Sequence, residues 1–179
     1  SPNTVNIIGN GVALNIPALE REIGHVTAGG IPAPRLMVSD RTQIVMPYHI
    51  LLDNYEEERL SDNQFGSTRS GIAPFYSDKY AKIGFQVCEL FDEETLYEKL
   101  RGVCEYKNAL IVHLYHKPAL DPDGLMETLA EYREAIRPYV ADVRSFLRDA
   151  VREDRKILLE GQLGALKDPD FGIYPFTTS

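Results

Sequence analysis

The sequence contains no tryptophan and only two cysteines, Cys88 and Cys104. Two cysteines so placed form neither a disulfide framework nor a metal-ligand motif, which argues against a small disulfide-rich or zinc-stabilised domain. We expect both to be free, buried thiols, as is typical of a reducing compartment. The sequence therefore predicts a cytoplasmic protein.

Long hydrophobic runs are also absent. The longest apolar stretch, residues 109–115, is interrupted by His113, and it falls far short of the roughly 20 residues that a membrane-spanning helix needs. The N-terminus has no signal-peptide pattern, and its first residues, Ser1-Pro2-Asn3, lack an initiator Met. We therefore expect no membrane partner, and we interpret the chain as a piece of a longer protein.

Basic residues are in the minority. The sequence has 19 Lys and Arg against 27 Asp and Glu, a net charge of −8 at pH 7 and a pI of about 5.0. The field of so acidic a chain repels nucleic acid and anionic membranes, so we expect no nucleic-acid partner. A small anion can still bind where basic side chains gather locally.

Several familiar catalytic motifs are missing. The sequence has no GxxxxGK[ST] phosphate loop, and it shows no Ser-His-Asp or Cys-His arrangement. His113 and His116 have the i, i+3 spacing of two metal ligands, but no further ligand is evident nearby. We therefore predict no metal site in this chain.

The residues that are present follow the pattern of an α/β protein with a helical middle. The length of 179 residues corresponds to about one domain. Residues 1–46 predict a βαβ unit with a parallel strand pair. Its parts are a strand over 5–8, a helix capped by Asn15 and stopped by Gly29–Gly30, and a strand over 35–39.

Residues 47–91 predict a helix over 47–60, a polar loop and a short helix opened by Pro74. Residues 83–88 predict an extended segment or weak strand. In the first of these helices, we expect the interior face to carry Ile50, Leu51, Asn54 and Tyr55.

Residues 92–152 predict a helical subdomain. Asp92 caps its first helix, a second helix covers 121–137 until Pro138 breaks it, and a third covers 140–151.

The last part of the chain, residues 153–179, predicts a strand over 157–159 followed by a polar, Gly-rich loop. Ligands of open α/β sheets bind at such carboxyl ends of strands.

The most distinctive stretch is GSTRSGIAPFYSDKYAK, residues 66–82. In the loop 66–71, glycines let backbone N–H groups converge on an anion, hydroxyls add donors, and the next helix adds its positive dipole end. Lys79 and Lys82 have the i, i+3 spacing of one helix face, where a bound phosphate would offset their repulsion. A plain surface turn followed by two solvated lysines fits the same residues, and both interpretations stay open.

Together these segments resemble the adenylosuccinate synthetase family. IGNGVALNIPALEREI is similar to the family's IGNGVVxxPxxLxxEI, and GSTRSGIAPFYSDKYAK is similar to its signature GTTxRGIGPxYxDKxxR. Three further segments resemble family segments in the same order, and the resemblance runs through the whole chain. They are RLMVSDRTQIVMPYHILLD, IRPYVADV and LLEGQLGALKDPDFGIYPFTTS.

The resemblance implies a ligase of AMP biosynthesis. In the family, GTP phosphorylates the 6-oxygen of IMP, and the amine of L-aspartate displaces that phosphate to give adenylosuccinate, with Mg²⁺ neutralising charge in the phosphoryl transfer. The implied fold is part of a P-loop-type mixed or parallel sheet, and the implied assembly is a homodimer. The family's phosphate loop, with its Mg²⁺ ligand, precedes the first residue here. We therefore predict that residues 1–179 are the central part of a single larger catalytic domain and are inactive alone.

The resemblance also implies roles for individual residues. Lys79 matches a lysine important for activity, and Thr68 and Thr178 match threonines that contact IMP. Lys82 occupies the place of an arginine that reaches across the dimer to IMP. Lysine keeps the charge of that arginine but loses its bidentate fork to phosphate.

The largest departure from the family lies in EGQLG, residues 160–164. The family has Gly-Ala-Gln-Gly there, and its glutamine contacts IMP, whereas here Leu163 holds that position and Gln162 stands one place earlier. Leucine cannot make the hydrogen bond, so we hypothesise that Gln162 reaches the base instead. A modified purine nucleotide stays open as the substrate. So do a non-catalytic purine-nucleotide-binding or dimerisation module and a degraded paralogue that binds nothing.

Overall fold

The structure is a computed structural model that describes residues 3–161 and 164–178. Short 3-10 turns cover Ser61–Asn63, Val87–Phe91, Arg137–Tyr139 and Ala165–Lys167. In chain order, the strands and α-helices are β1 Val5–Ile8, β2 Ala13–Leu14, α1 Ile16–Ala28, β3 Arg35–Ser39, β4 Gln43–Ile44, α2 Pro47–Leu60, α3 Ile72–Ala81, α4 Glu93–His113, α5 Pro122–Ile136, β5 Val140–Ala141 and α6 Val143–Arg152.

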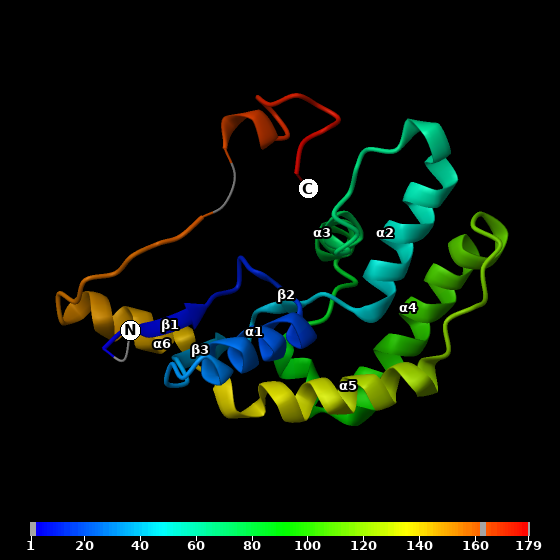
Figure 1. The fold of residues 1–179 in the computed structure, drawn as a ribbon. Coiled ribbons are helices and arrows are strands. Elements are labelled where there is room, and N and C mark those ends of the chain that lie inside the picture. The colour runs from blue at the N-terminus through cyan, green and yellow to red at the C-terminus, as the bar shows by residue number, and fades with distance from the viewer. Residues whose placement is uncertain (1–2, 162–163, 179) are drawn as a thin grey trace.

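The predicted α/β class is confirmed, and the strands are parallel. β1, α1 and β3 form the expected βαβ unit, in which Val5 pairs with Arg35 and Ile8 with Val38. The side chain of Asn15 caps α1, because its Oδ1 accepts a hydrogen bond from Ala18 N at 3.0 Å. The sheet lies at one end of the molecule, and α2, α3 and α4 lie at the other (Figure 1).

The third strand of the sheet is not the one that the sequence predicts. β5 pairs with β3 in parallel, which gives the strand order β1-β3-β5. The helix expected over 140–151 therefore begins later, at Val143, where Asp142 caps it by accepting from Ser145 N at 3.0 Å. The β-branched Val140 supplies strand propensity, and the Asp142 cap sets the helix start.

The predicted strand over 157–159 is wrong. These residues have no regular structure, and Leu158 and Leu159 are 91% and 86% exposed. A strand needs a neighbour for its backbone N–H and C=O groups and a surface to cover its side chains. Within residues 3–161 and 164–178, no strand pairs with this segment.

A second, two-stranded sheet pairs β2 with β4 in parallel, and the sequence did not predict it. The segment 83–88 forms no strand. Gln86 makes one isolated bridge to Gln43, and a 3-10 turn begins at Val87. Cys88 in this turn is exposed, so the expectation that it is buried is wrong.

Helix α2 has the predicted bounds, but a different face is buried. Tyr48, His49 and Leu52 are buried, whereas Leu51 is 39% exposed, and the other three expected interior residues are only partly buried. The buried face continues through Asp53 and Glu57 at helical spacing. Polar side chains on this face masked it in the sequence, where apolar residues mark the interior.

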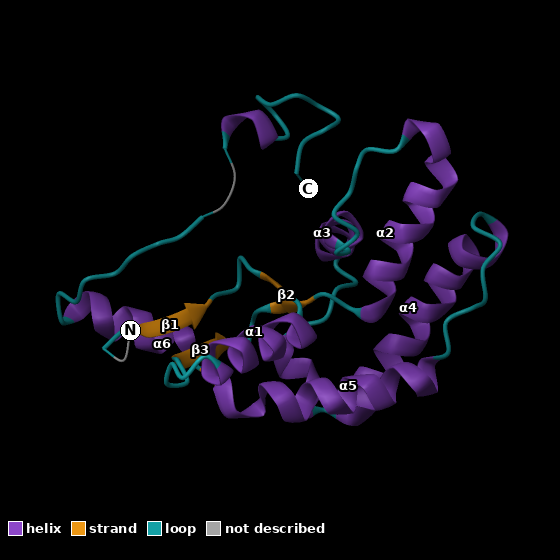
Figure 2. Cartoon of the chain, in the orientation of Figure 1, coloured by secondary structure: helices purple, strands orange, loops and turns teal. Residues whose placement is uncertain are grey.

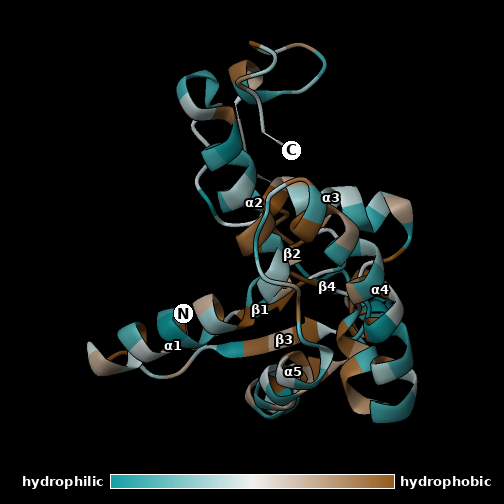
Figure 3. Ribbon diagram, turned by 90° about the vertical axis from the view of Figure 1, so that its right-hand side faces the viewer, coloured by the Kyte–Doolittle hydropathy of each residue, from teal (hydrophilic) through white to brown (hydrophobic). Residues whose placement is uncertain are grey.

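The helical middle of the chain follows the prediction. Asp92 caps α4 by accepting from Thr95 N at 3.2 Å, and Asp121 caps α5. Leu96, Leu100 and Cys104 of α4 are buried, so the expectation for Cys104 is confirmed. Helices α1 and α6 lie beside β1 and β3 (Figure 2), and both strands carry apolar stretches (Figure 3). Among the described residues, no helix is long and apolar enough to cross a membrane.

Candidate functional site

The loop 66–71 is held in place by one buried carboxylate of α2. The Oδ1 of Asp53 accepts a hydrogen bond from the Ser67 hydroxyl at 2.6 Å, and its Oδ2 accepts one from the Gly71 amide at 2.8 Å. The side chain of Asp53 therefore ties the beginning of the loop to its end. Between the two anchors, Thr68 and Arg69 are exposed to solvent.

The end of the loop is packed so closely on α2 that only glycine fits. Gly71 has φ +80, in the left-handed region, and a Cβ built there would lie 2.8 Å from Ile50 N and 2.9 Å from His49 C. Gly71 is also the residue before α3, so this contact sets where α3 begins. The helix itself starts at Ile72, two residues before the predicted Pro74.

The exposed tip of the loop is internally ordered. The Ser67 hydroxyl accepts from Arg69 N at 3.0 Å, and the hydroxyls of Thr68 and Ser70 share a hydrogen bond. Arg69 has φ 55. No ion pair holds its guanidinium within the part of the chain that the structure describes. The tip thus combines two hydroxyls and one unpaired positive charge at the N-terminal end of α3.

The two lysines of the 66–82 stretch do not share a helix face. Lys79 lies on α3, is partly buried, and its ammonium sits 5.6 Å from the centre of the Tyr76 ring. Lys82 follows the helix as its C-cap in the left-handed conformation, with φ 64, and is exposed. The prediction that both lysines lie on one face of a helix is therefore wrong. The helix ends at Ala81, one residue before Lys82.

A cluster of three buried polar side chains lies beneath α3. His49 of α2, Asp78 of α3 and Lys107 of α4 are 0%, 1% and 5% exposed. His49 Nε2 lies 3.0 Å from Asp78 Oδ2, and Lys107 Nζ donates to Asp78 Oδ1. Met46 N donates to His49 Nδ1 at 2.9 Å. Because Nδ1 accepts, the proton of the neutral ring sits on Nε2 and is donated to Asp78.

The charges in this cluster follow from burial and hydrogen bonding. Burial lowers the pKa of His49, and the hydrogen bond and charge of Asp78 offset that effect only in part. Burial raises the pKa of Asp78, but the hydrogen bonds from His49 and Lys107 and the charge of Lys107 outweigh it, so the pKa lies below its usual range. The cluster thus holds a neutral imidazole, an ionised carboxylate and an ammonium.

The C-terminal segment folds on itself. Thr178 N donates to the Lys167 carbonyl at 2.9 Å, and Asp168 Oδ1 accepts from the amides of Asp170 and Phe171. Among the described residues, no hydrogen bond or ion pair joins 164–178 to the rest of the chain. Figures 1 and 3, from perpendicular directions, place its end near α3.

The structure thus places Thr68 before the start of α3 and Lys79 in its last turn, so the helix separates them, and Thr178 lies in a separate segment. Gln162 and Leu163 lie outside the described residues. Asp53, His49, Asp78 and Lys107 were not predicted from the sequence. A signal for two of them exists: His49 and Asp53 stand four residues apart on the helix face that carries Leu52.

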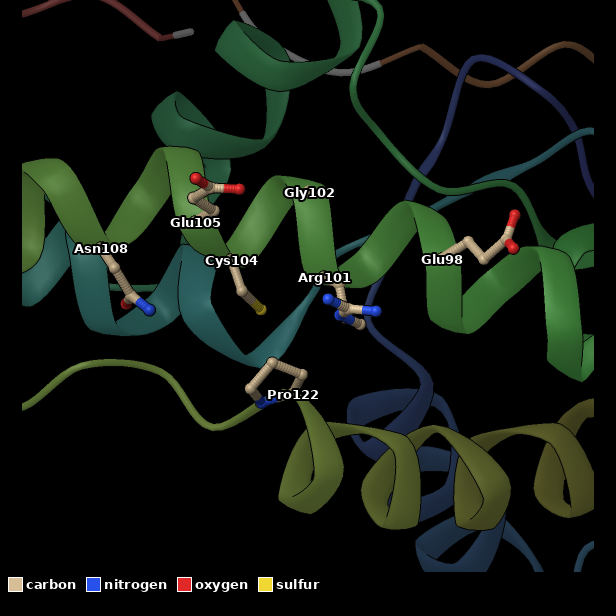
Figure 4. A pocket seen from close by; sticks show the side chains of 7 residues that line it. All are labelled: Glu98, Arg101, Gly102, Cys104, Glu105, Asn108 and Pro122. Atoms are coloured by element: carbon tan, nitrogen blue, oxygen red, sulfur yellow. The ribbon is translucent and has the colours of Figure 1, made fainter.

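A hollow in the described structure lies away from these residues. It has a volume of about 510 Å³, lies between α4 and the start of α5, and contains none of the predicted site residues (Figure 4). Its lining includes Glu98, Arg101, Cys104 and Glu105. No group of three or more His, Cys, Asp or Glu able to hold a metal ion occurs among the residues that the structure describes.

A parallel α/β fold with a hydroxyl-rich loop anchored at a helix N-terminus defines a class of protein suited to an anionic ligand. A family model described as "Adenylosuccinate synthetase" matches residues 1–179. The chain therefore belongs to the adenylosuccinate synthetase family.

Curated relatives and a solved structure agree with this assignment. The chain is 42% identical over 178 residues to adenylosuccinate synthetase of Halothermothrix orenii, covering 99% of this chain and 42% of the relative. It is 43% identical over 173 residues to that of Lactobacillus delbrueckii subsp. bulgaricus, covering 97% and 40%. The structure of fully ligated adenylosuccinate synthetase from Plasmodium falciparum superposes with a TM-score of 0.81 at 28% identity, covering 100% of this chain and 41% of that chain. The chain thus spans about two fifths of the length of the relatives it matches.

Proposed function

We propose that the full gene product ligates IMP and L-aspartate to adenylosuccinate at the expense of GTP, in AMP biosynthesis. The observation that carries this proposal is the family match across residues 1–179, which includes the loop 66–71 and Lys79 of the following helix. The γ-phosphoryl group of GTP passes to the 6-oxygen of IMP and leaves GDP. The amine of aspartate then attacks C6, the C–O bond breaks, and inorganic phosphate leaves with that oxygen.

Thr68 and Lys79 form the first half of the proposed IMP site. The exposed Thr68 hydroxyl lies at the positive end of α3, where it can donate to an anion or to the base. Lys79 supplies a positive charge on the same helix, and we assign it the catalytic role of stabilising the transferred phosphoryl group. Thr178, Gln162 and Leu163 form the second half of the proposed IMP site, with Gln162 as the donor to the base.

We propose a cytoplasmic homodimer, in which Lys82 reaches the IMP of the partner subunit. Lys82 is exposed at the end of α3, two residues after the exposed Tyr80, which leaves it accessible to a second subunit. A lysine there keeps the charge toward phosphate but not the two parallel hydrogen bonds that an arginine makes.

GTP and Mg²⁺ are assigned to parts of the gene product other than this chain. Among the described residues no cluster of ligand-type side chains fits a metal ion, and the sequence has no GxxxxGK[ST] phosphate loop. Residues 1–179 would then be the central part of a single catalytic domain, and we expect them to be inactive alone.

A non-catalytic module that binds purine nucleotides or forms dimers is the second candidate. Lys82 and Leu163, where the family has Arg and Gln, are the residues that favour it. Such a module would bind IMP without releasing phosphate.

The test is phosphate release by the purified full gene product with IMP, L-aspartate, GTP and Mg²⁺, omitting each in turn. We expect release only when all four are present. Thr68→Ala should raise the IMP KM on the order of 10-fold, the worth of one hydrogen bond in a bound state. Thr128→Ala, at a partly exposed position of α5, is the matched control and should match wild type. IMP binding without phosphate release would select the non-catalytic module, and no IMP binding would reject both candidates.

A further inference from the structure

The proposed reaction gives no role to the buried cluster of His49, Asp78 and Lys107. Its three side chains come from α2, α3 and α4, so one carboxylate joins three helices. Both oxygens of Asp78 are engaged, and both His49 nitrogens are used, since Nδ1 accepts from Met46 N. The cluster is therefore closed, with no side-chain oxygen or ring nitrogen left free for a ligand.

A buried ion pair is a poor way to gain stability. Removing a carboxylate and an ammonium from water costs about as much as their attraction returns, and apolar replacements are often equally stable. The arrangement instead fixes the orientation of the side chains around Asp78, because hydrogen bonds to a planar carboxylate position its neighbours more narrowly than apolar packing does. A cluster of this kind sets the position of α3 relative to α2 and α4.

The groups positioned in this way belong to the candidate site. Asp78 is the residue before Lys79, so a shift of the Asp78 carboxylate moves the Lys79 backbone with it. Gly71 packs directly on the backbone of His49. A Cβ added to Gly71 would lie only 2.9 Å from His49 C. The ring of His49 also meets Phe75 of α3 edge-on, with ring centres 5.9 Å apart. The loop 66–71 and Lys79 therefore rest on the same cluster from two sides.

We propose that His49, Asp78 and Lys107 are positioning residues that hold Lys79 and the loop 66–71 in the geometry needed for IMP. They touch no substrate and act through the backbone of α3 and through the Gly71 contact. The kinetic test of this inference rests on the proposed function. A second test, by hydrogen exchange, is independent of that function.

The kinetic test compares Lys107→Met with Lys117→Met in the full gene product. Lys117 also pairs with a carboxylate of α2, Glu58 at 2.8 Å, but that pair is exposed, so the same substitution there is a matched control. We expect Lys107→Met to raise the IMP KM and lower kcat, with kcat/KM down on the order of 10- to 100-fold, since a misplacement of about 1 Å has that effect. The GTP KM should stay within about two-fold, and the control should match wild type.

The proposal is overturned if kcat per folded molecule and both KM values in Lys107→Met equal those of wild type. A fall in kcat that only matches a smaller folded fraction leaves kcat per folded molecule unchanged, and it too overturns the proposal. Lys107→Gln keeps an N–H donor toward Asp78 and serves as the second variant if Lys107→Met does not fold.

A second measurement separates this proposal from the proposed function. Hydrogen exchange of the unliganded gene product needs no activity, so it applies even if wild type releases no phosphate. We expect amides of residues 66–82 to exchange at least about 10-fold faster in Lys107→Met than in Lys117→Met. Equal exchange in the two variants rejects the positioning role, whatever the reaction turns out to be.

Discussion

At the scale of single residues, the candidate site depends on a few positions where another residue would disturb the backbone or remove hydrogen bonds to the loop. Gly71 is the sharpest of them, because its positive φ and its contact with α2 act together. Asp53 is another, since both of its carboxylate oxygens are used by the loop. Neither would be recognised by residue type alone, as glycine and aspartate are common in ordinary turns.

Gly71→Ala should destabilise the protein more than Gly66→Ala does. Both glycines have positive φ, but a Cβ at Gly66 meets nothing within 4 Å, whereas one at Gly71 lies 2.8 Å from Ile50 N. We expect about 1 kcal/mol for the left-handed conformation at Gly66. A further 1–3 kcal/mol, roughly, is expected for the clash at Gly71. Denaturant unfolding measures both, and equal losses would mean that the Gly71 contact with α2 is not as described.

Acidification should weaken the fold through His49. Its pKa in the fold lies below the usual 6.5, so the unfolded chain binds the proton more readily and the free energy of unfolding falls as pH drops below 6.5. Three ionisable side chains lie around the His49 ring: Asp78 of α3, Lys107 of α4 and Tyr48 of α2. Burial raises the pKa of Tyr48, and the charges of Asp78 and Cys104 raise it further. The lowered pKa of Asp78 adds a separate loss at more acidic pH, below 3.8.

Unfolding curves of wild type, His49→Gln and His113→Gln between about pH 8 and pH 5 test this linkage. His113 is exposed and serves as the control. We expect the stability of wild type and His113→Gln to decline together, while His49→Gln starts lower and declines less. Three parallel curves would show that His49 is not the group responsible.

At the scale of elements, the loop 66–71 behaves as part of α2 and α3 rather than as a free connection. Its two anchors are hydrogen bonds to one side chain of α2, and its last residue begins α3. A loop fixed in this way keeps its hydroxyls in place before a ligand arrives, which reduces the ordering cost of binding.

Asp53→Ala should therefore be more harmful than Ser67→Ala. The first removes both anchors and leaves the Gly71 amide unpaired, for which we expect a loss of about 2–3 kcal/mol; the second removes one hydrogen bond, worth about 1 kcal/mol. Unfolding free energies measure the difference, with the exposed Asp62→Ala as control. If Asp53→Ala were no worse than Ser67→Ala, the loop would not be anchored by the carboxylate.

Local signals in the sequence predicted many of the elements. Asn15, Asp92 and Asp121 mark helix starts because their side chains cap the first turn, and these helices were found close to their observed bounds. Long-range pairing was not predictable in this way. β5 is two residues long and is a strand only because β3 lies beside it, whereas the more apolar 157–159 has no partner in the described structure.

The candidate site was predicted in part for the same reason. Thr68 and Lys79 belong to a contiguous stretch whose pattern can be matched as a unit. The cluster of His49, Asp78 and Lys107 joins residues 29 apart in sequence at each step, and it becomes visible only when three helices are packed together. A buried charge looks like a surface charge in a sequence, because its type says nothing of its burial.

At the scale of the whole molecule, the chain is a section of a larger family architecture. It spans about 42% of the Halothermothrix relative. The side chains of Leu158, Leu159 and Phe171 are almost fully exposed in the chain as it stands. The side chains that hold the loop 66–71 and α3, Asp53, His49 and Lys107, all lie within residues 46–107.

We propose that the full gene product phosphorylates the 6-oxygen of IMP and that aspartate then displaces it. IMP carrying a heavy oxygen isotope at position 6 tests it directly in the full gene product. We expect the label to appear in the inorganic phosphate that is released with each adenylosuccinate, because the C–O bond of the purine is the bond that breaks. Phosphate free of the label, with or without product, would contradict it.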